Sequence, residues 1–138
     1  MKRSIFVILI IIILIAVVFS GCQENKSTTV TTENVFLESD IVEFANVSLE
    51  KIRNKTGIVD MITVSWLFHN IAGRTISADI IVEFYDITDV LVYSDFRQIV
   101  NMPADYTEQY MSPTANRVSY DGERVSYVDY VIIHVTET

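Results

Sequence analysis

The stretch that decides the fold class is residues 61–70, which read Met-Ile-Thr-Val-Ser-Trp-Leu-Phe-His-Asn. Apolar side chains stand at Ile62, Val64, Trp66 and Phe68, and the positions between them are mostly polar. Successive side chains of a β-strand point to opposite faces, so this period of two predicts a half-buried strand. We expect Trp66 to be a core residue between two sheets, with a ligand-stacking role as the alternative.

Further strands are expected on both sides of this one. Residues 79–86 repeat the alternation, with Ile80, Val82 and Phe84 on a shared face. Other segments with strand-like composition are 41–53, 90–93, 97–102 and 125–135. The last of these is apolar on both faces, which favours a central buried strand. A face that meets a partner or a second copy is the alternative for that segment.

Turn residues separate these segments about every ten positions, and no helical period follows Cys22. The Asp121-Gly122 pair predicts a type I′ hairpin turn, in which both central positions need positive φ. About seven short strands predict an all-β protein, and the size fits an immunoglobulin-like antiparallel β-sandwich. We assign residues 40–138 to this single domain.

The N-terminus has the features of an export signal. Lys2 and Arg3 supply positive charge, residues 5–19 are apolar, and small residues precede Cys22. This order of features predicts a secretory signal peptide at residues 1–21. Because the apolar run is close to the roughly 20 residues that cross a bilayer, an uncleaved signal anchor stays open as an alternative.

Cys22 is the single cysteine of the chain, which excludes an internal disulfide and a zinc site built from several thiolates. The sequence Phe19-Ser20-Gly21-Cys22 resembles the lipobox of prokaryotic lipoproteins. The resemblance implies cleavage before Cys22, a diacylglyceryl group on its sulfur, and a protein held on the cell membrane facing outside. Two acyl chains are enough for stable anchoring.

Residues 22–39 are expected to link this lipid to the domain. Residues 23–32 are rich in Ser, Thr and Asn and have no apolar period, which is typical of a flexible tether. Asn25, Asn46 and Asn54 each begin an Asn-X-Ser/Thr pattern, the acceptor signal for N-glycosylation of an exported chain. We name these three as candidate glycosylation sites, with an archaeal host as the favourable case.

The chain is acidic, with 10 Lys and Arg against 18 Asp and Glu and a formal charge of −8. Setting aside Lys2 and Arg3 leaves 8 basic against 18 acidic side chains, or −10, for the chain that follows the signal. A negative surface repels phosphate backbones, so we expect no nucleic-acid partner.

Three segments carry recognisable strand ends. Residues 64–70 end in Asn, residues 78–86 end in Glu-Phe-Tyr-Asp, and residues 101–104 contain Pro. Together they resemble the FxLYD-type immunoglobulin-like domains of prokaryotic lipoproteins, although Ile-Thr-Asp follows the second segment where that family usually has a Gly turn. The resemblance covers roughly residues 41–135 and implies an extracytoplasmic sandwich with no assigned chemistry.

The titratable residues form no recognised catalytic motif. His69 and His134 lie on expected strands, where a packed or edge histidine is the ordinary outcome. Asp86, Asp89 and Asp95 gather near a turn, and calcium binding is the alternative to turn closure, but their spacing does not match an EF-hand loop. We therefore predict no catalytic residue, no metal and no cofactor.

The sequence predicts a non-enzymatic, lipid-anchored surface module that binds a protein or glycan of unknown identity. One alternative is a spacer subunit of an envelope or transport complex, and another is an unrecognised hydrolase that uses His69 or His134. Tyrosine suits recognition because it joins a large rigid surface to a polar tip, although strand propensity also enriches it. The tyrosines of the last third are Tyr106, Tyr110, Tyr120, Tyr127 and Tyr130.

Overall fold

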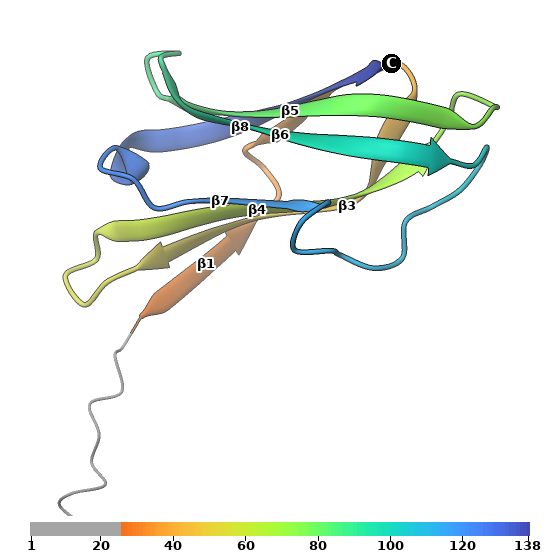
Figure 1. Cartoon of the computed structure of the whole chain (residues 1–138). Coiled ribbons are helices and arrows are strands. Elements are labelled where there is room, and N and C mark those ends of the chain that lie inside the picture. Colours follow the sequence, from red (N-terminus) through yellow and green to blue (C-terminus); the bar gives the residue numbers. More distant parts are fainter. Residues whose placement is uncertain (1–25) are drawn as a thin grey trace, which may run out of the picture.

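The computed structural model describes residues 26–138, which form two four-stranded β-sheets packed face to face (Figure 1). Sheet A contains, in spatial order, β1 (Ser27–Thr31), β3 (Val42–Arg53), β4 (Val59–Asn70) and β7 (Arg117–Tyr120). Sheet B contains β2 (Val35–Glu38), β8 (Val128–Glu137), β5 (Ile76–Asp86) and β6 (Leu91–Met102). A short 3-10 helix, η1 (Val125–Tyr127), precedes β8. The predicted all-β fold is confirmed, while the signal peptide expected at residues 1–21 lies outside the described residues.

The core lies between the sheets and is built from the inward positions of each strand. In β4 the even-numbered positions 62–68 are all buried, and Trp66 is fully enclosed (0% exposed), as predicted. In β5 the buried positions include Ile80, Val82 and Phe84, again as the alternation predicts. Each fully buried large apolar side chain contributes about 1.5–3 kcal/mol to folding, so this layer is the main source of stability.

The β3–β4 and β5–β6 hairpins lie in different sheets, and the chain crosses between the sheets after β1, β2, β4, β6 and β7. β8 pairs with β5 antiparallel and with β2 parallel, so it is a central strand of sheet B. Its inward residues Val131, Ile133 and Val135 are buried, whereas Tyr130 and Ile132 on its other face are only partly covered. The central position predicted for this segment is confirmed, but only one face of it is buried.

The segment expected as a linker, residues 22–39, contains two strands. β1 pairs antiparallel with β3, and β2 supplies the buried Val35 to the core. The Thr and Val residues of β1 are β-branched and favour extended backbone, which a reading of their polarity alone overlooks. The prediction of a linker at residues 22–39 therefore does not hold for residues 27–31 and 35–38.

The Asp121-Gly122 pair does not form the predicted hairpin turn. It joins β7 in sheet A to η1 and then to β8 in sheet B, and Gly122 has no positive φ. Glycine is needed there for another reason, because a Cβ at this position would overlap the ring of Tyr120. The separate strands expected at 90–93 and 97–102 form the single strand β6. The strands β1, β2 and β7 were not expected, and the described residues form eight strands in all.

The turn between β3 and β4 is closed by one side chain. Asn54 Oδ1 accepts hydrogen bonds from Thr56 N (2.9 Å), Thr56 Oγ1 (2.7 Å) and Ile58 N (3.1 Å). Gly57 has a φ of 83°, a left-handed conformation that glycine adopts without strain. The carbonyl oxygen of the Asn54 amide thus replaces the backbone partners that the turn residues lack.

Asn70, the last residue of β4, is fully buried and fixes one end of the sandwich. Its Nδ2 donates to the carbonyl oxygens of Arg74 (2.8 Å), Met102 (3.1 Å) and Pro103 (2.7 Å), and its Oδ1 accepts from Ala72 N (2.9 Å). One amide therefore joins β4 to the loop that follows it and to the end of β6. Buried polar groups satisfied in this way specify a unique arrangement of the chain.

Candidate functional site

The side of sheet B that faces away from the core carries the candidate binding surface. Cross-strand partners share a face of a sheet. The register gives one row of outward residues formed by Glu38, His134, Ile81 and Phe96, and a second row formed by Phe36, Ile132, Glu83 and Ser94. We call these two rows, together with Asp79, Tyr85 and Tyr130 on the same face, the sheet B outer face.

Large apolar side chains of the sheet B outer face are open to solvent. Phe36, Ile81 and Phe96 are 53%, 43% and 49% exposed, respectively. They come from three different strands, and the register places Ile81 directly between His134 and Phe96. Contiguous exposed apolar side chains rimmed by polar ones are typical of interaction surfaces.

His134 lies on this face between two carboxylates. Its Nδ1 is 2.9 Å from Glu38 Oε2, and its Nε2 is 3.0 Å from Glu83 Oε2. Each ring nitrogen of His134 therefore lies within hydrogen-bonding distance of a carboxylate oxygen. The network joins β2, β8 and β5 across the sheet.

Two stacked tyrosines border the histidine network. The rings of Tyr85 and Tyr130 are 5.2 Å apart at 11°, and Phe36 meets Tyr130 edge-on at 6.0 Å. The Tyr85 hydroxyl donates to Glu83 Oε2 (2.6 Å), and this hydrogen bond is the main cause that raises the pKa of Tyr85 to about 12. The Tyr130 hydroxyl donates to Asp89 Oδ1 (2.9 Å), and desolvation together with this bond raises the pKa of Tyr130.

The sheet B outer face is acidic. It contains Glu38, Asp79 and Glu83, and His134 is its one basic side chain among the described residues. The described strands of sheet B contain a single Lys or Arg, Arg97, which lies at an inward position of β6 and donates from Nη2 to the Arg117 carbonyl of sheet A (3.2 Å). Among the described residues, Glu38 and Glu83 contact His134, whereas Asp79 Oδ1 accepts from Gln98 Nε2 (2.9 Å).

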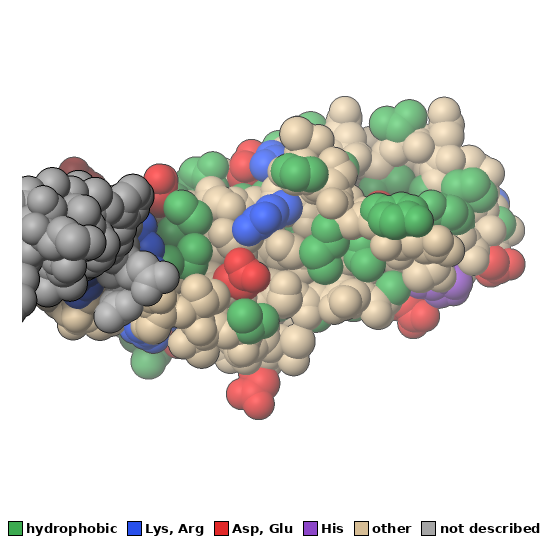
Figure 2. All heavy atoms as spheres, turned by 90° about the horizontal axis from the view of Figure 1, so that it is seen from below, with side chains coloured by type: hydrophobic (Ala, Val, Ile, Leu, Met, Phe, Trp, Pro, Cys, Tyr) green, Lys and Arg blue, Asp and Glu red, His purple; other side chains and the backbone are tan. Residues whose placement is uncertain are grey.

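Figure 2 shows the sheet A side of the molecule, where hydrophobic side chains lie in separate groups among other atoms. The candidate glycosylation residue Asn46 is exposed on this side, because its cross-strand partner Leu67 points outward. Asn54 is only partly exposed, and its Nδ2 donates to Asp60 Oδ1 (3.0 Å). The remaining candidates, Cys22 and Asn25, lie outside the described residues, so all four assignments stay predictions.

The two histidines are not brought together. His69 lies on β4 in sheet A, where its Nδ1 is 2.7 Å from Thr107 Oγ1, whereas His134 lies on β8 in sheet B. Thr107 belongs to the long loop between β6 and β7, which runs along the edge of β4. Glu108 of that loop accepts from Phe68 N (2.8 Å), so the loop covers backbone groups that β7 does not reach.

The five tyrosines of the last third do not form one surface. Tyr106 and Tyr110 lie on the loop between β6 and β7, and Tyr110 is 84% exposed. Tyr120 of β7 packs against the core, Tyr127 projects from η1, and only Tyr130 belongs to the sheet B outer face. Sequence position alone therefore did not locate the site.

The three aspartates considered for calcium have other partners. Asp86 Oδ1 accepts from Thr88 N (2.9 Å), Thr88 Oγ1 (2.6 Å) and Val90 N (3.1 Å), and these bonds, led by the Thr88 hydroxyl, lower the pKa of Asp86. Asp89 has a φ of 61° in the same turn, and Asp95 pairs with an arginine further along β6. Within residues 26–138, no three His, Cys, Asp or Glu side chains are placed to hold a metal.

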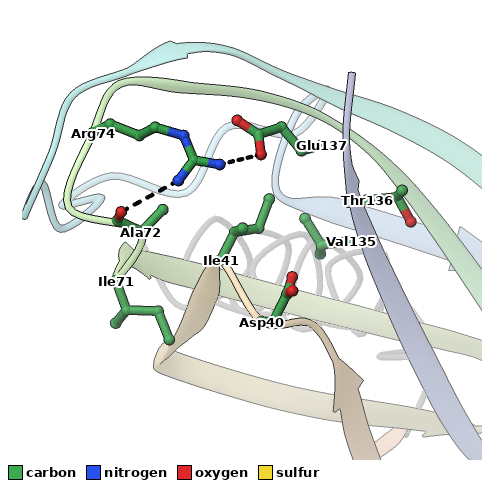
Figure 3. A pocket seen from close by; sticks show the side chains of 8 residues that line it. All are labelled: Asp40, Ile41, Ile71, Ala72, Arg74, Val135, Thr136 and Glu137. Atoms are coloured by element: carbon green, nitrogen blue, oxygen red, sulfur yellow. Dashed lines mark hydrogen bonds and ion pairs between the residues drawn. The ribbon is translucent and has the colours of Figure 1, made fainter.

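A hollow of about 550 Å³ lies at the end of the sandwich where β8 finishes (Figure 3). Arg74 and Glu137 form an ion pair across it, and Arg74 also donates to the Ala72 carbonyl (3.5 Å). Asp40 and Ile41 line the opposite wall. The hollow is open and is lined by the charged side chains of Arg74, Glu137 and Asp40, so it lacks the enclosed apolar lining of a ligand pocket.

Comparison with known proteins gives no relative for this chain. No family model, no curated protein and no solved structure matches it. The candidate site is therefore defined by its geometry. Sequence reasoning missed it because Phe36 and Glu38 fell within the expected linker at residues 22–39, and no local pattern predicts that β2 pairs with β8.

Proposed function

We propose that this chain is a membrane-anchored extracytoplasmic lipoprotein whose sandwich is a non-enzymatic binding module. Its contact surface is the sheet B outer face. The observation that carries the proposal is the exposure of Phe36, Ile81 and Phe96 beside polar groups that are already bonded to one another. Covering such a face is favourable, since each Å² of apolar surface removed from water contributes about 25 cal/mol.

The proposed membrane location rests on the export signal expected at residues 1–21 and on Cys22 in its lipobox-like context. No helix within residues 26–138 is long and apolar enough to cross a membrane. The described chain enters the fold through β1 of sheet A, where Ser27 pairs with Arg53. Sheet B forms the other layer (Figure 1), so a tether that begins at Cys22 leads first to the layer that does not carry the contact surface.

The position of Asn46 also supports the sheet B outer face as the contact surface. This candidate glycosylation residue is exposed on the outer side of sheet A. A glycan attached there would cover sheet A and leave sheet B accessible to a partner.

A binding role rather than catalysis fits the surroundings of both histidines. A general base must reach a proton of its substrate. Both nitrogens of His134 are engaged by Glu38 and Glu83 on an open sheet face, and His69 Nδ1 is engaged by Thr107. The hydrolase alternative predicts a hydrolytic activity of the purified chain that His134→Gln or His69→Gln abolishes.

We also propose that the sandwich belongs with the immunoglobulin-like domains of the FxLYD type. The motif residues behind that resemblance have structural partners here: Asn70 at the end of β4 bonds to the Pro103 carbonyl after β6 (2.7 Å). Asp86 at the end of β5 closes the following turn, and Asp89 has a positive φ in this turn, where that family usually has a Gly turn. A crystal structure of a member of that family with the same order of strands in each sheet would support this class, and a different order would contradict it.

The proposed function is tested by purifying the full-length tagged chain from membranes of its own organism. The wild type is compared with Ile81→Ser/Phe96→Ser and with the control Val30→Ser/Ile58→Ser, which changes two exposed apolar residues outside sheet B (58% and 56% exposed). We expect a partner that copurifies with the wild type and the control and is lost from the sheet B variant at an unchanged melting temperature. Equal loss from both variants, or retention by both, would contradict the contact surface.

The same sample tests the anchor. Mass spectrometry should find a lipidated Cys22 at the N-terminus of the mature chain. An intact N-terminus at Met1 with an unmodified Cys22 would contradict the lipoprotein assignment. In that outcome an uncleaved signal anchor holds the protein on the membrane. Separately, the absence of a copurifying partner for every variant would support the spacer alternative.

A further inference from the structure

We propose that the partner of the sheet B outer face is a polypeptide segment in which Lys or Arg side chains alternate with apolar ones. The inference rests on the proposed function and names the class of ligand for that surface. Two observations carry it together: the pattern of charge on the face and the free edge of the same sheet.

The charge on this face calls for a cationic partner. Glu38, Asp79 and Glu83 project from three positions of the sheet, and His134 is the one basic side chain that faces them among the described residues. The Glu38 side chain is 64% exposed, so a partner ammonium or guanidinium group can approach it directly. Complementary charge of this kind steers association and selects among partners.

Apolar residues stand next to these charged residues across the strands. In the first row Glu38 and His134 are followed by Ile81 and Phe96, and in the second row Glu83 stands beside Ile132. A ligand that is only cationic would leave Ile81 and Phe96 uncovered. A ligand with both kinds of side chain covers the apolar residues and pairs with the carboxylates.

The sheet edge favours a polypeptide over other cationic ligands. β6 is the last strand of sheet B, so one row of its backbone N–H and C=O groups has no strand partner among the described residues. An extended peptide can add to such an edge through main-chain hydrogen bonds, and every second side chain of the peptide then extends the outer face beside β6. Phe96 is on this strand and links the edge to the face.

Other occupants fit less well. A second copy of the face would bring carboxylates against carboxylates, which is unfavourable. Anionic lipid headgroups and nucleic acids are repelled for the same reason. A neutral sugar has no cationic group to pair with Glu38 and Asp79, and Tyr85 and Tyr130 already stack on each other.

The test uses the full-length lipidated chain in neutral detergent micelles and three synthetic peptides. The probes are an alternating Lys-Val peptide, the matched Gln-Val peptide and the matched Glu-Val peptide, with affinity measured by calorimetry. Glu38→Gln/Asp79→Asn/Glu83→Gln neutralises the face. The control Glu33→Gln/Glu43→Gln/Asp105→Asn removes the same net charge elsewhere on the described chain.

We expect the Lys-Val peptide to bind and the Glu-Val peptide not to bind. The face variant should weaken Lys-Val binding by about tenfold, which corresponds to ~1.4 kcal/mol, whereas the control changes it by less than about twofold. Equal weakening by the face variant and the control would overturn the inference, because attraction would then follow net charge alone. Far-UV circular dichroism confirms that each variant is folded.

A third variant, Phe36→Ser/Phe96→Ser, separates the inference from the proposed function. If the Gln-Val peptide binds as tightly as the Lys-Val peptide and this variant abolishes both, the cationic class is overturned and the contact surface stands. If this variant leaves Lys-Val binding unchanged, the contact surface itself is contradicted. Loss of Lys-Val binding in this variant, with weaker binding of the Gln-Val peptide to the wild type, supports both.

Discussion

The hydroxyl of Tyr85 and the carboxylate of Glu83, two residues apart on β5, are joined by a hydrogen bond of 2.6 Å on the outer face of sheet B. The same carboxylate oxygen lies 3.0 Å from His134 Nε2. The Glu83 carboxylate thus joins β5 to β8 through His134 and fixes the Tyr85 ring on the surface that we propose for binding. The relationship has a measurable consequence for the ionisation of Tyr85.

Tyr85 should ionise near pH 12 rather than at its ordinary value of 10.0, because the neutral phenol donates to Glu83 and the phenolate cannot. Since the folded pKa is raised, the stability that this bond contributes is present below pH 10 and is lost as the pH rises through about 12. Absorbance of tyrosinate should show a late step in the wild type that is absent from Tyr85→Phe. Glu83→Gln should move that step to lower pH. If Tyr85→Phe instead loses tyrosinate absorbance near pH 10 and keeps the late step, the assignment is contradicted.

Asn70→Asp should strongly destabilise the fold. The buried amide donates to three carbonyl oxygens, and a carboxylate in its place would face the same oxygens without a proton to give. We expect a loss of about 3 kcal/mol in the free energy of unfolding at pH 7, measured by urea titration. Asn101→Asp, an exposed position with a φ of 51°, is the matched control and should change stability by less than about 0.5 kcal/mol. A loss below about 1 kcal/mol for Asn70→Asp would mean that the amide does not hold this end of the sandwich.

Asp86→Asn should preserve the β5–β6 turn, while Asp86→Ala should lower the melting temperature. Asn54 makes the same set of bonds with an amide oxygen in the β3–β4 turn, so an acceptor oxygen rather than a charge is what the turn requires. The pKa of Asp86 is held below 3.8, so the stability from its ionised form is present above that pH and is lost as the pH falls through the lower folded value. Thermal melts at pH 7 and pH 3 measure both effects. An Asp86→Asn protein as unstable as Asp86→Ala at pH 7 would contradict this account of the turn.

The period of two was sufficient to predict the inner strands but not the first ones. Residues 62–68 and 80–84 alternate because one face of each strand is buried, and burial enforces the pattern. β1 is a short strand at the edge of sheet A with little buried surface, so its Ser and Thr residues resemble those of a linker. The prediction of a hairpin turn at Asp121-Gly122 was wrong because the close contact with Tyr120 requires glycine at position 122, as a hairpin turn would.

The sheet B outer face was harder to predict than the fold. Its residues are separated by up to 98 positions, from Phe36 to His134, and they meet only because β8 lies between β2 and β5. Parallel pairing of β2 with β8 is a long-range contact that no local motif encodes. The sequence did contain the exposed Ile81 as an apolar residue that interrupts the polar face of its strand, and that interruption was the available signal.

The central claim is that the sheet B outer face contacts a partner while the protein sits on its membrane. The most direct measurement replaces Phe96 or, separately, Val30 of sheet A with the photoreactive residue benzoylphenylalanine in the full-length chain. Phe96 and Val30 are similarly exposed, 49% and 58%, so a difference in crosslinking between them reflects the sheet on which each residue lies and not its accessibility. After irradiation of intact cells, we predict a discrete covalent adduct from position 96 and none from position 30. An adduct from position 30 alone, or none from either position, would contradict the claim.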